Sequence, residues 1–416
     1  MSAGLTKHDR RPSSKMRILR IIARLNIGGP AIQAILLSGT DIEQSYRSIL
    51  VCGQISPGEG DMSYLAQEKG VKPVIVPELG REISFLNDFF CFIALRRIIK
   101  KSHPLIVHTH TAKAGTLGRL AVFSINFARA NHRKIKTVHT FHGHVFHSYF
   151  GRFKSMAFRL IERWLAKGTD RIIVLSSSQR RDIEYKFRIA SPKKIRIVPL
   201  GFDLSPFKEC DKYRHEIRSQ ILPSNDLFCL GMIGRLTAIK NNHLLLEAVS
   251  KLKRWKKLKG FHFLIIGDGE LRQELEEKAL AMKIGDHITF TGWQRDLPPF
   301  YGALDGVVFT SRNEGTPVAL IEALAARKPI ISARVGGVED LLGSTMIKKG
   351  KDFTFAPRGI LISSGDADAL ARAMIYLREG KKNIIPMVTR ARDFVMKNFS
   401  KERLINDICS IYKELM

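Results

Sequence analysis

The sequence predicts an α/β protein with two domains, each folded around a parallel, doubly wound sheet. Short apolar segments typical of buried strands alternate with amphipathic segments typical of helices through both halves of the chain, and this alternation indicates parallel sheets. A length of 416 residues favours two domains, and a hydrophobic content of 44% can fill two cores. We expect a disordered basic tail at residues 1–15, domains at 16–200 and 201–386, and a final helix at 387–416.

The first predicted strand, Arg17–Ala23, leads into Gly28 and Gly29 before a helix begins near Pro30. Paired glycines let a backbone approach a ligand closely, and proline suits the start of a helix. An ordinary strand-to-helix turn would explain the same residues. We take Gly28 and Gly29 as candidate ligand-binding positions.

Histidines follow two predicted strands of the first domain, Leu105–Val107 and Ile135–Val138. They are His108, His110, His139, His142, His144 and His147. Ligands of open α/β sheets bind beyond the carboxyl ends of the strands, so both groups can face a ligand. The H-x-H spacing suits zinc, but no Cys, Asp or Glu lies among these histidines, which favours hydrogen bonding over metal binding.

Positive charge is concentrated in the first half of the chain. The net charge is +29, of which residues 1–200 carry +21, and thirteen basic residues but no acidic ones lie between Asp88 and Glu162. Basic and large apolar side chains interleave in Phe85–Lys101 and Tyr149–Lys167. Such helices can lie in an anionic membrane interface, although a core-packed helix with a solvated basic face is the simpler explanation of either one. For the domain as a whole we expect attachment to an anionic membrane surface.

Other classes of protein and location fit less well. The basic residues match no nucleic-acid recognition motif, so we expect no nucleic-acid partner, and Lys251–Gly260 is expected to be a solvated helix end. Five scattered cysteines without C-x-x-C pairing argue against a disulfide framework. No apolar run is long enough to span a bilayer, and residues 1–15 lack the apolar core of a signal peptide. These features predict a cytoplasmic protein at the inner face of the membrane.

In the second domain, the predicted strand Cys229–Ile233 is followed by Arg235 and Lys240. Two cations at the end of a parallel strand suit a diphosphate, since Arg offers a planar fork and Lys a point charge. A second strand, Phe263–Ile266, runs into Gly267 in a Gly-Asp-Gly turn. That turn alone is a weak signal, but it lies at the same predicted edge.

Two glutamates flank a turn that opens the next helix. A predicted strand, Gly306–Thr310, precedes Glu314, and Glu322 follows eight residues later within the helix. The turn and the helix start comprise Gly315, Thr316, Pro317 and Val318. The N–H groups of a helix N-terminus bind phosphate, and carboxylates on either side can accept hydrogen bonds from sugar hydroxyls. The pattern therefore predicts a nucleotide-sugar site, against the alternative of a capped helix with a solvated glutamate.

Asp366 and Asp368 imitate a D-x-D metal motif. Their context is a loop that enters an amphipathic helix, where Asp366 suits the N-cap and Asp368 the first turn. We expect neither a metal nor a cofactor there.

Together these motifs resemble the retaining glycosyltransferases of family 4 (group 1), which have the GT-B fold of two Rossmann-like domains facing a cleft. The resemblance covers residues 16–416 and is most specific in the elements that contain Glu314 with Glu322 and Arg235 with Lys240. The segments RLNIGGPAIQA and HTHTAKAGTLGRLA are most similar to members that build bacterial lipopolysaccharide and other surface polysaccharides.

The resemblance implies a role for each site residue. Arg235 and Lys240 would hold the donor diphosphate, Glu314 would contact the transferred sugar, and Glu322 would contact the nucleotide ribose. The final helix would cross back to the first domain, which would hold the acceptor.

The family also places a functional histidine after a strand of the first domain, in a pattern similar to T-F-H. His142 matches that pattern best, with His144 and His110 as alternatives.

The implied reaction is retaining, metal-independent transfer of a hexose-type sugar from a nucleoside-diphosphate sugar, with UDP the commoner carrier. The acceptor would be a lipid-linked or lipopolysaccharide saccharide. A nucleotide-sugar epimerase or a phosphorylase can share the fold, and a non-catalytic membrane-associated adaptor is the alternative from another class.

Overall fold

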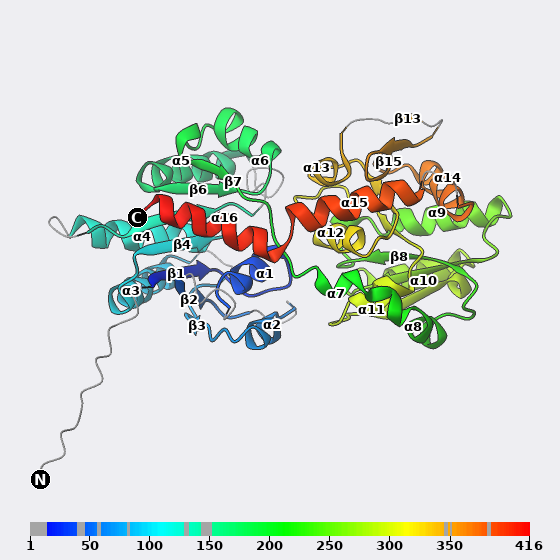
Figure 1. Cartoon of the computed structure of the whole chain (residues 1–416), viewed down its shortest axis with the longest axis horizontal. Coiled ribbons are helices and arrows are strands. Elements are labelled where there is room, and N and C mark those ends of the chain that lie inside the picture. Colours follow the sequence, from blue (N-terminus) through cyan, green and yellow to red (C-terminus); the bar gives the residue numbers. More distant parts are fainter. Residues whose placement is uncertain are drawn as a thin grey trace, which may run out of the picture. The chain divides into compact units, whose positions relative to one another are not determined.

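The computed structural model describes residues 15–39, 46–55, 60–80, 84–128, 133–142, 152–344, 348–349, 352–380 and 384–416. The chain divides into two compact units, and each is folded around its own sheet (Figure 1). Unit 1 comprises Met1–Ile173, Ile183–Arg196 and Ile408–Met416, and unit 2 comprises Val174–Asp182 and Ile197–Asp407.

The sheet of unit 1 has the strand order β3-β2-β1-β4-β5-β6-β7. The strands are β1 (Met16–Ile22), β2 (Tyr46–Cys52), β3 (Val74–Ile75), β4 (Ile106–His110), β5 (Lys136–Thr140), β6 (Arg171–Val174) and β7 (Ile195–Ile197). The pairings of β1 with β2 and β4, of β2 with β3, and of β5 with β4 and β6 are parallel. The chain order reverses between β1 and β4, and this is where open α/β sheets bind ligands.

Helices cover both faces of this sheet. They are α1 (Gly29–Leu36), α2 (Ser63–Glu68), α3 (Phe85–Ser102), α4 (Ala112–Phe127) and α5 (Arg152–Gly168). Alternate residues of a strand point to opposite faces, and β1 follows this rule: Leu19 and Ile21 pack with α3 and α4, whereas Ile22 packs with α1 and α2. Because both faces are buried, the strand is apolar with little alternation, as the sequence predicts.

The sheet of unit 2 has the order β10-β9-β8-β11-β12-β15-β14-β13. The strands are β8 (Phe228–Ile233), β9 (Phe261–Ile266), β10 (Ile288–Gly292), β11 (Gly306–Phe309), β12 (Ile330–Ala333), β13 (Lys348–Lys349), β14 (Thr354–Ala356) and β15 (Gly359–Ile362). The pairings from β10 through β15 are parallel, but β14 pairs antiparallel with both β15 and β13. An antiparallel extension at one edge therefore modifies the wholly parallel sheet that the sequence predicts.

Most helices of unit 2 connect these strands in turn. They are α7 (Ser205–Lys208), α8 (Arg214–Ile221), α9 (His243–Arg254), α10 (Arg272–Ala281), α11 (Pro298–Ala303), α12 (Val318–Ala325), α13 (Val338–Leu342) and α14 (Ala367–Arg378). The core of the unit joins α9, α10 and α14 to the central strands. Here too the chain order reverses between neighbouring strands, β8 and β11.

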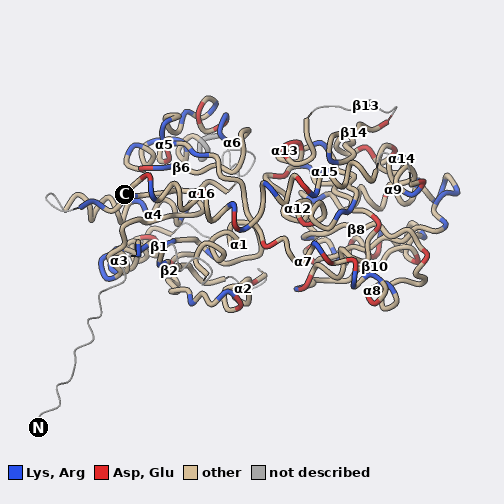
Figure 2. The backbone as a smooth tube through the Cα atoms, in the orientation of Figure 1, with Lys and Arg blue, Asp and Glu red and all other residues tan. Residues whose placement is uncertain are grey.

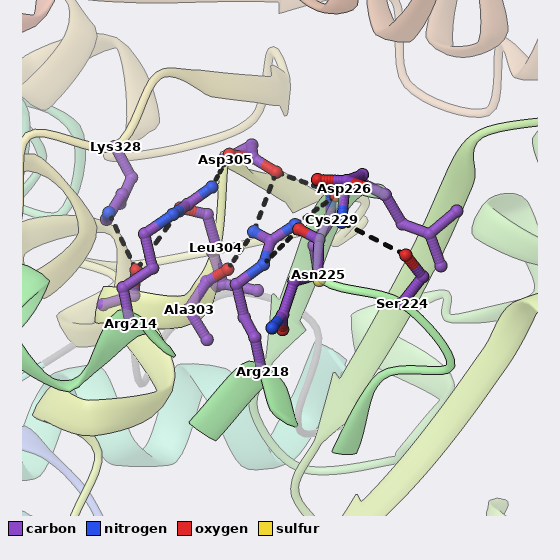
Figure 3. Close-up of polar contacts among 12 residues, drawn as sticks. Arg214, Arg218, Ser224, Asn225, Asp226, Cys229, Ala303, Leu304, Asp305 and Lys328 are labelled. Carbon is purple, nitrogen blue, oxygen red and sulfur yellow. Dashed lines mark hydrogen bonds and ion pairs between the residues drawn. The ribbon is translucent and has the colours of Figure 1, made fainter. Parts of the chain in front are cut away.

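A cluster of charged groups closes the amino-terminal end of β11 (Figure 3). Asp305 accepts hydrogen bonds from Arg214 at 2.5 Å, from Arg218 at 3.2 Å and from the backbone N–H of Cys229 at 2.7 Å. Arg218 also donates to the carbonyls of Asn225, Leu227 and Ala303. The cluster fastens α8 to the first residues of β8 and β11, on the edge opposite to the predicted ligand site.

The predicted final helix is in fact two helices, α15 (Ile384–Asn398) and α16 (Lys401–Glu414). The break at Phe399 and Ser400 arises because the backbone N–H of Phe202 donates to the Phe399 carbonyl at 2.8 Å, and Phe202 forms a β-bridge with Ser400. Gly201 permits this approach, since a Cβ there would lie 2.4 Å from the Cβ of Leu404. The prediction of one continuous helix was therefore wrong.

All five cysteines are unpaired and buried, as expected without a disulfide framework. Within the described residues, no helix combines the length and the apolar character that crossing a bilayer requires.

Candidate active site

The loops that follow β8 and β11 bring two of the predicted site residues into contact. Because β8 and β11 are paired neighbours, their carboxyl ends lie side by side. Lys240 ends a short 3₁₀ turn after β8, and its Nζ lies 2.5 Å from Oε1 of Glu314 in the loop after β11. Ser311 donates to the same oxygen at 2.6 Å. A cation and a carboxylate, predicted separately from two motifs, thus form one unit.

Backbone contacts hold these two loops together. The hydroxyl of Thr310 donates to the Lys240 carbonyl at 2.9 Å, and the N–H of Arg312 donates to the Ile239 carbonyl at 2.9 Å. Lys240 and Glu314 are both only partly exposed, at 28% and 12% of their side chains. The pair is therefore positioned by the fold and remains within reach of a ligand.

The N-terminus of α12 is open, as the Gly-Thr-Pro turn predicts. Pro317 occupies the N-cap, no side chain caps the helix, and Val318 is its first residue. The leading N–H groups of a helix have no partner within it, so they can bind an anion. Gly315 and Thr316 precede the helix beside Glu314.

A second glycine pair, not identified from the sequence, supports this turn. The N–H of Gly337 donates to the Glu314 carbonyl at 3.0 Å. A Cβ at Gly336 would lie 2.0 Å from the Glu314 carbonyl oxygen, and one at Gly337 would lie 1.7 Å from that of Gly315. Only glycines fit there. The signal that could have revealed them is the Gly-Gly step that follows β12.

Glu322 is the fifth residue of α12, and its carboxylate contacts Tyr301 of α11. The Tyr301 hydroxyl lies 3.0 Å from Oε2 of Glu322 and 2.8 Å from the Ala319 carbonyl. Burial raises the pKa of Glu322 to about 7, and the hydrogen bond from Tyr301 opposes part of this rise. Sequence reasoning missed Tyr301, because only the packing of α11 beside α12 brings it to the site.

Gly267 lies on the third predicted loop, where backbone packing requires it. Its φ is +135°, and a Cβ there would lie 2.1 Å from the Gly234 carbonyl oxygen. The N–H of Gly267 donates to the Gly292 carbonyl at 2.9 Å. The loops after β8, β9 and β10 therefore meet by backbone contact, and a direct contact of Gly267 with a ligand stays a prediction.

Arg235 is exposed on the loop after β8. Among the described residues it forms no ion pair, so its guanidinium is available to an anion.

Unit 1 carries the remaining predicted residues. Gly28 has a φ of +151° and immediately precedes α1, in which Gly29 and Pro30 are the first two residues. A backbone in this region favours glycine. The turn thus has the geometry that the glycine pair predicts.

His142 follows β5, and its Nε2 lies 2.8 Å from Nδ1 of His110 at the end of β4. Burial lowers the pKa of His142 to about 3, and it also lowers the pKa of His110. The ring of His142 borders a cavity of about 20 Å³, which has room for one water molecule. Two of the three candidate histidines therefore touch, and the third, His144, lies outside the described residues together with His147.

The other two histidines are buried and paired within unit 1. Nδ1 of His139 lies 2.9 Å from the Thr109 hydroxyl, and Nε2 of His108 lies 2.8 Å from the Thr140 hydroxyl. In the part of the chain that the structure describes, no three His, Cys, Asp or Glu side chains are arranged to hold a metal ion.

Asp366 is the N-cap of α14, as predicted, and accepts a hydrogen bond from the Ala369 N–H at 2.9 Å. Asp368 lies in the first turn and pairs with Lys251 at 2.7 Å. Both aspartates of the apparent metal motif thus have structural partners.

Two family models match the chain. One, described as glycosyltransferase family 4, matches residues 27–206, and the other, described as glycosyl transferases group 1, matches residues 228–379. Among curated proteins, the chain is 28% identical over 367 residues to the UDP-Gal:α-D-GlcNAc-diphosphoundecaprenol α-1,3-galactosyltransferase of Escherichia coli, covering 86% of this chain and 89% of that one. It is 24% identical over 353 residues to the capsular polysaccharide biosynthesis glycosyltransferase CapM of Staphylococcus aureus, covering 82% and 85%.

Solved structures share the fold. HepE of Anabaena in complex with UDP superposes with a TM-score of 0.77 at 19% identity, over 96% of this chain and all of that one. Sucrose-phosphate synthase of Thermosynechococcus elongatus superposes with a TM-score of 0.74 at 18% identity, over 96% and 99%. The predicted GT-B fold class, with two Rossmann-like domains, is confirmed by these likenesses.

Proposed function

The chain belongs to the group 1 glycosyltransferases of family 4, and on that premise we propose that it transfers a hexose-type sugar from a UDP-sugar to a lipid-linked or lipopolysaccharide saccharide in surface-glycan biosynthesis. The observation that carries the proposal is the contact between Lys240 and Glu314 beside the open N-terminus of α12. Two relatives named above act in surface-glycan assembly by their names, and the first uses UDP-galactose. HepE, which shares the fold, binds UDP.

Each group at this edge has a chemical task. Breaking the sugar–phosphate bond builds negative charge on the diphosphate, which Lys240, Arg235 and the leading N–H groups of α12 would neutralise without a metal ion. Lys240 donates one N–H to Glu314 and keeps two for phosphate oxygens. Glu314 would accept hydrogen bonds from hydroxyls of the transferred sugar, and Glu322 from those of the ribose.

Retention of configuration follows from attack on the face that the leaving group departs from. The departing phosphate oxygen would take the proton of the acceptor hydroxyl, and His142 would orient the donor or the acceptor. Glu314 is engaged by Lys240 and Ser311 and is assigned to binding rather than to nucleophilic attack.

The acceptor would be presented at a membrane surface by unit 1. Two of its helices expose large apolar side chains beside basic ones, and Lys and Arg, blue in Figure 2, recur along both. On α3 these apolar residues are Phe85, Leu86, Phe89 and Phe90, and on α5 they are Met156, Leu160, Ile161 and Trp164. Phe85 is 94% and Leu86 is 73% exposed. Basic residues flanking exposed aromatic ones suit an anionic lipid surface.

The proposal is tested by a thermal-shift screen against UDP-, GDP-, ADP- and dTDP-sugars. A ligand at 100 times its Kd raises the free energy of unfolding by about 2.7 kcal/mol. We expect a shift with UDP-sugars that Lys240→Ala abolishes and Lys251→Ala retains. Lys251 is a matched control, because it forms a similar half-buried pair with Asp368, at 2.7 Å, on α9 and α14.

Turnover completes the test. UDP should appear only when an acceptor is present, the product should keep the anomeric configuration of the donor, and EDTA should leave the rate unchanged. Binding to vesicles that contain anionic lipid should fall when Phe85 and Leu86 are changed to Ser. A protein that binds such vesicles but no nucleotide sugar would be an adaptor, and release of UDP without an acceptor would overturn the proposed transfer.

A further inference from the structure

Two histidine side chains meet by their ring nitrogens at the carboxyl ends of β4 and β5. Nδ1 of His110 lies 2.8 Å from Nε2 of His142. The outer nitrogens, Nε2 of His110 and Nδ1 of His142, are buried and have no hydrogen-bond partner among the described residues. A neutral imidazole has one donor and one acceptor nitrogen, so the pair shares one proton in the contact and presents one donor and one acceptor outward.

The ring beneath this pair has a fixed protonation state. His108 stacks on His110 with ring centroids 4.3 Å apart, and its Nδ1 lies 2.8 Å from the guanidinium of Arg20. Because arginine only donates, Nδ1 of His108 must accept, and its Nε2–H therefore donates to Thr140. Burial and the charge of Arg20 lower the pKa of His108. His110 is therefore held against a neutral, fully engaged ring.

Burial decides which histidine of the pair donates. His110 is fully buried, whereas His142 is partly exposed. If His142 donated, the proton of His110 would sit on Nε2 as a buried N–H without a partner, which is rarer and more costly than an unpaired acceptor. If His110 donates from Nδ1, only a lone pair is left unpaired, and His142 carries its proton on Nδ1. The second arrangement costs less.

From this geometry we infer that His110 is a positioning residue, which holds His142 in the tautomer that donates a hydrogen bond from Nδ1 to an oxygen of the bound sugar substrate. The inference rests on the proposed function for the identity of that substrate. His142 then acts as a neutral donor that orients the substrate, and it is not the base that removes the acceptor's proton. A pKa of about 3 for His142 agrees with this role, since the ring stays neutral at working pH.

Amide side chains test the inference, because Asn places its amide where Nδ1 of histidine lies and Gln places it where Nε2 lies. His110→Asn keeps the contact to His142 and should retain kcat/KM within about threefold. His110→Gln and His110→Phe lose that contact and should lower kcat/KM by about 10- to 100-fold, as misplaced catalytic groups do. His142→Asn, which keeps a donor at the Nδ1 position, should be more active than His142→Gln.

A matched control and a spectroscopic readout separate positioning from folding. His262 is a buried histidine of unit 2 with a single ring contact, 2.8 Å to Thr289, and His262→Phe should leave kcat/KM unchanged. In two-bond ¹⁵N–¹H spectra of the full chain, His142 should be protonated on Nδ1 in the wild type and become a mixture of tautomers in His110→Phe.

The outcomes are distinct. Equal activity of the three His110 variants, or a wild-type His142 protonated on Nε2, would overturn the inference. If the wild type transfers no sugar, the proposed function fails, and the spectrum still decides whether His110 sets the tautomer of His142.

Discussion

Two pairs of opposite charge lie at the two ends of β11, and they serve different purposes. Asp305 precedes the strand and pairs with Arg218, and Glu314 follows it and pairs with Lys240. Arg218 is 3% exposed and donates from all its nitrogens, three of its acceptors being backbone carbonyls. Lys240 is 28% exposed, and Glu314 is the one acceptor of its ammonium among the described residues.

The difference separates a structural charge from a functional one. A buried cation whose donors are all satisfied has nothing left to offer a ligand, and it stabilises the fold only as long as each partner is present. A partly exposed cation with unused donors, at the end of the strands where loops converge, can exchange water for phosphate oxygens. Removing a carboxylate should therefore affect mainly stability at one end of β11 and mainly activity at the other.

The largest effect is expected for Asp305→Ala. Arg218 would remain buried without its counter-charge, and the N–H of Cys229 would lose its acceptor. The free energy of unfolding should fall by about 3–5 kcal/mol, measured by urea denaturation. The control is Glu209→Ala, because Glu209 is 74% exposed and pairs with Lys212 at 3.6 Å, so its loss should cost less than about 1 kcal/mol. Equal losses in the two variants would contradict the assignment of Asp305 as structural.

The opposite pattern is expected for Glu314→Gln. Shape is preserved and Ser311 keeps an acceptor, so the free energy of unfolding should change by about 1 kcal/mol or less. The transfer rate should fall by about 100-fold or more, because the amide binds sugar hydroxyls and orders Lys240 less well. Asp368→Asn removes the matching carboxylate beside Lys251 and should leave transfer intact. A stable Glu314→Gln protein with normal turnover would exclude Glu314 from the reaction.

The sequence was sufficient to predict what depends on local pattern. Strand-to-helix alternation predicts both sheets, and the position of polar residues after strands predicts that Lys240 and Glu314 belong to one site, because the ends of neighbouring parallel strands converge. The N-cap at Asp366 follows from its place before an amphipathic helix. These inferences need only the periodicity of the chain and the chemistry of each side chain.

What the sequence could not predict depends on contacts between distant segments. Tyr301 reaches Glu322 only because α11 packs beside α12, and Gly336 is required only because the Glu314 carbonyl lies against it. The pairing of His110 with His142 depends on the register of β4 and β5, in which His110 lies opposite Thr140. The break at Phe399 depends on the bond from Phe202, which no helical propensity reports.

The smallest effect concerns the pH dependence of Glu322. Folding raises the pKa of its carboxyl from an ordinary value near 4.5 to about 7, so between these values the folded state holds a proton that the unfolded state has lost. The stability that this proton confers is present below pH 4.5 and is lost as pH rises to about 7. The change is at most about 3 kcal/mol, and less because the carboxyl is partly exposed. Glu322→Gln should remove this fall from the urea-denaturation profile.

Binding should show the opposite dependence on pH, which links Glu322 to the ribose. An ionised carboxylate accepts two hydroxyl hydrogen bonds and a protonated one accepts fewer. Because UDP-glucose loses no proton between pH 6 and 8, its affinity should rise about tenfold over that range as Glu322 ionises. Isothermal titration of UDP-glucose into wild type and Glu322→Gln measures this directly. If both proteins gain affinity equally with pH, another group titrates on binding and Glu322 is not the ribose acceptor. If only the wild type gains, the raised pKa of Glu322 sets the pH at which the site accepts its nucleotide.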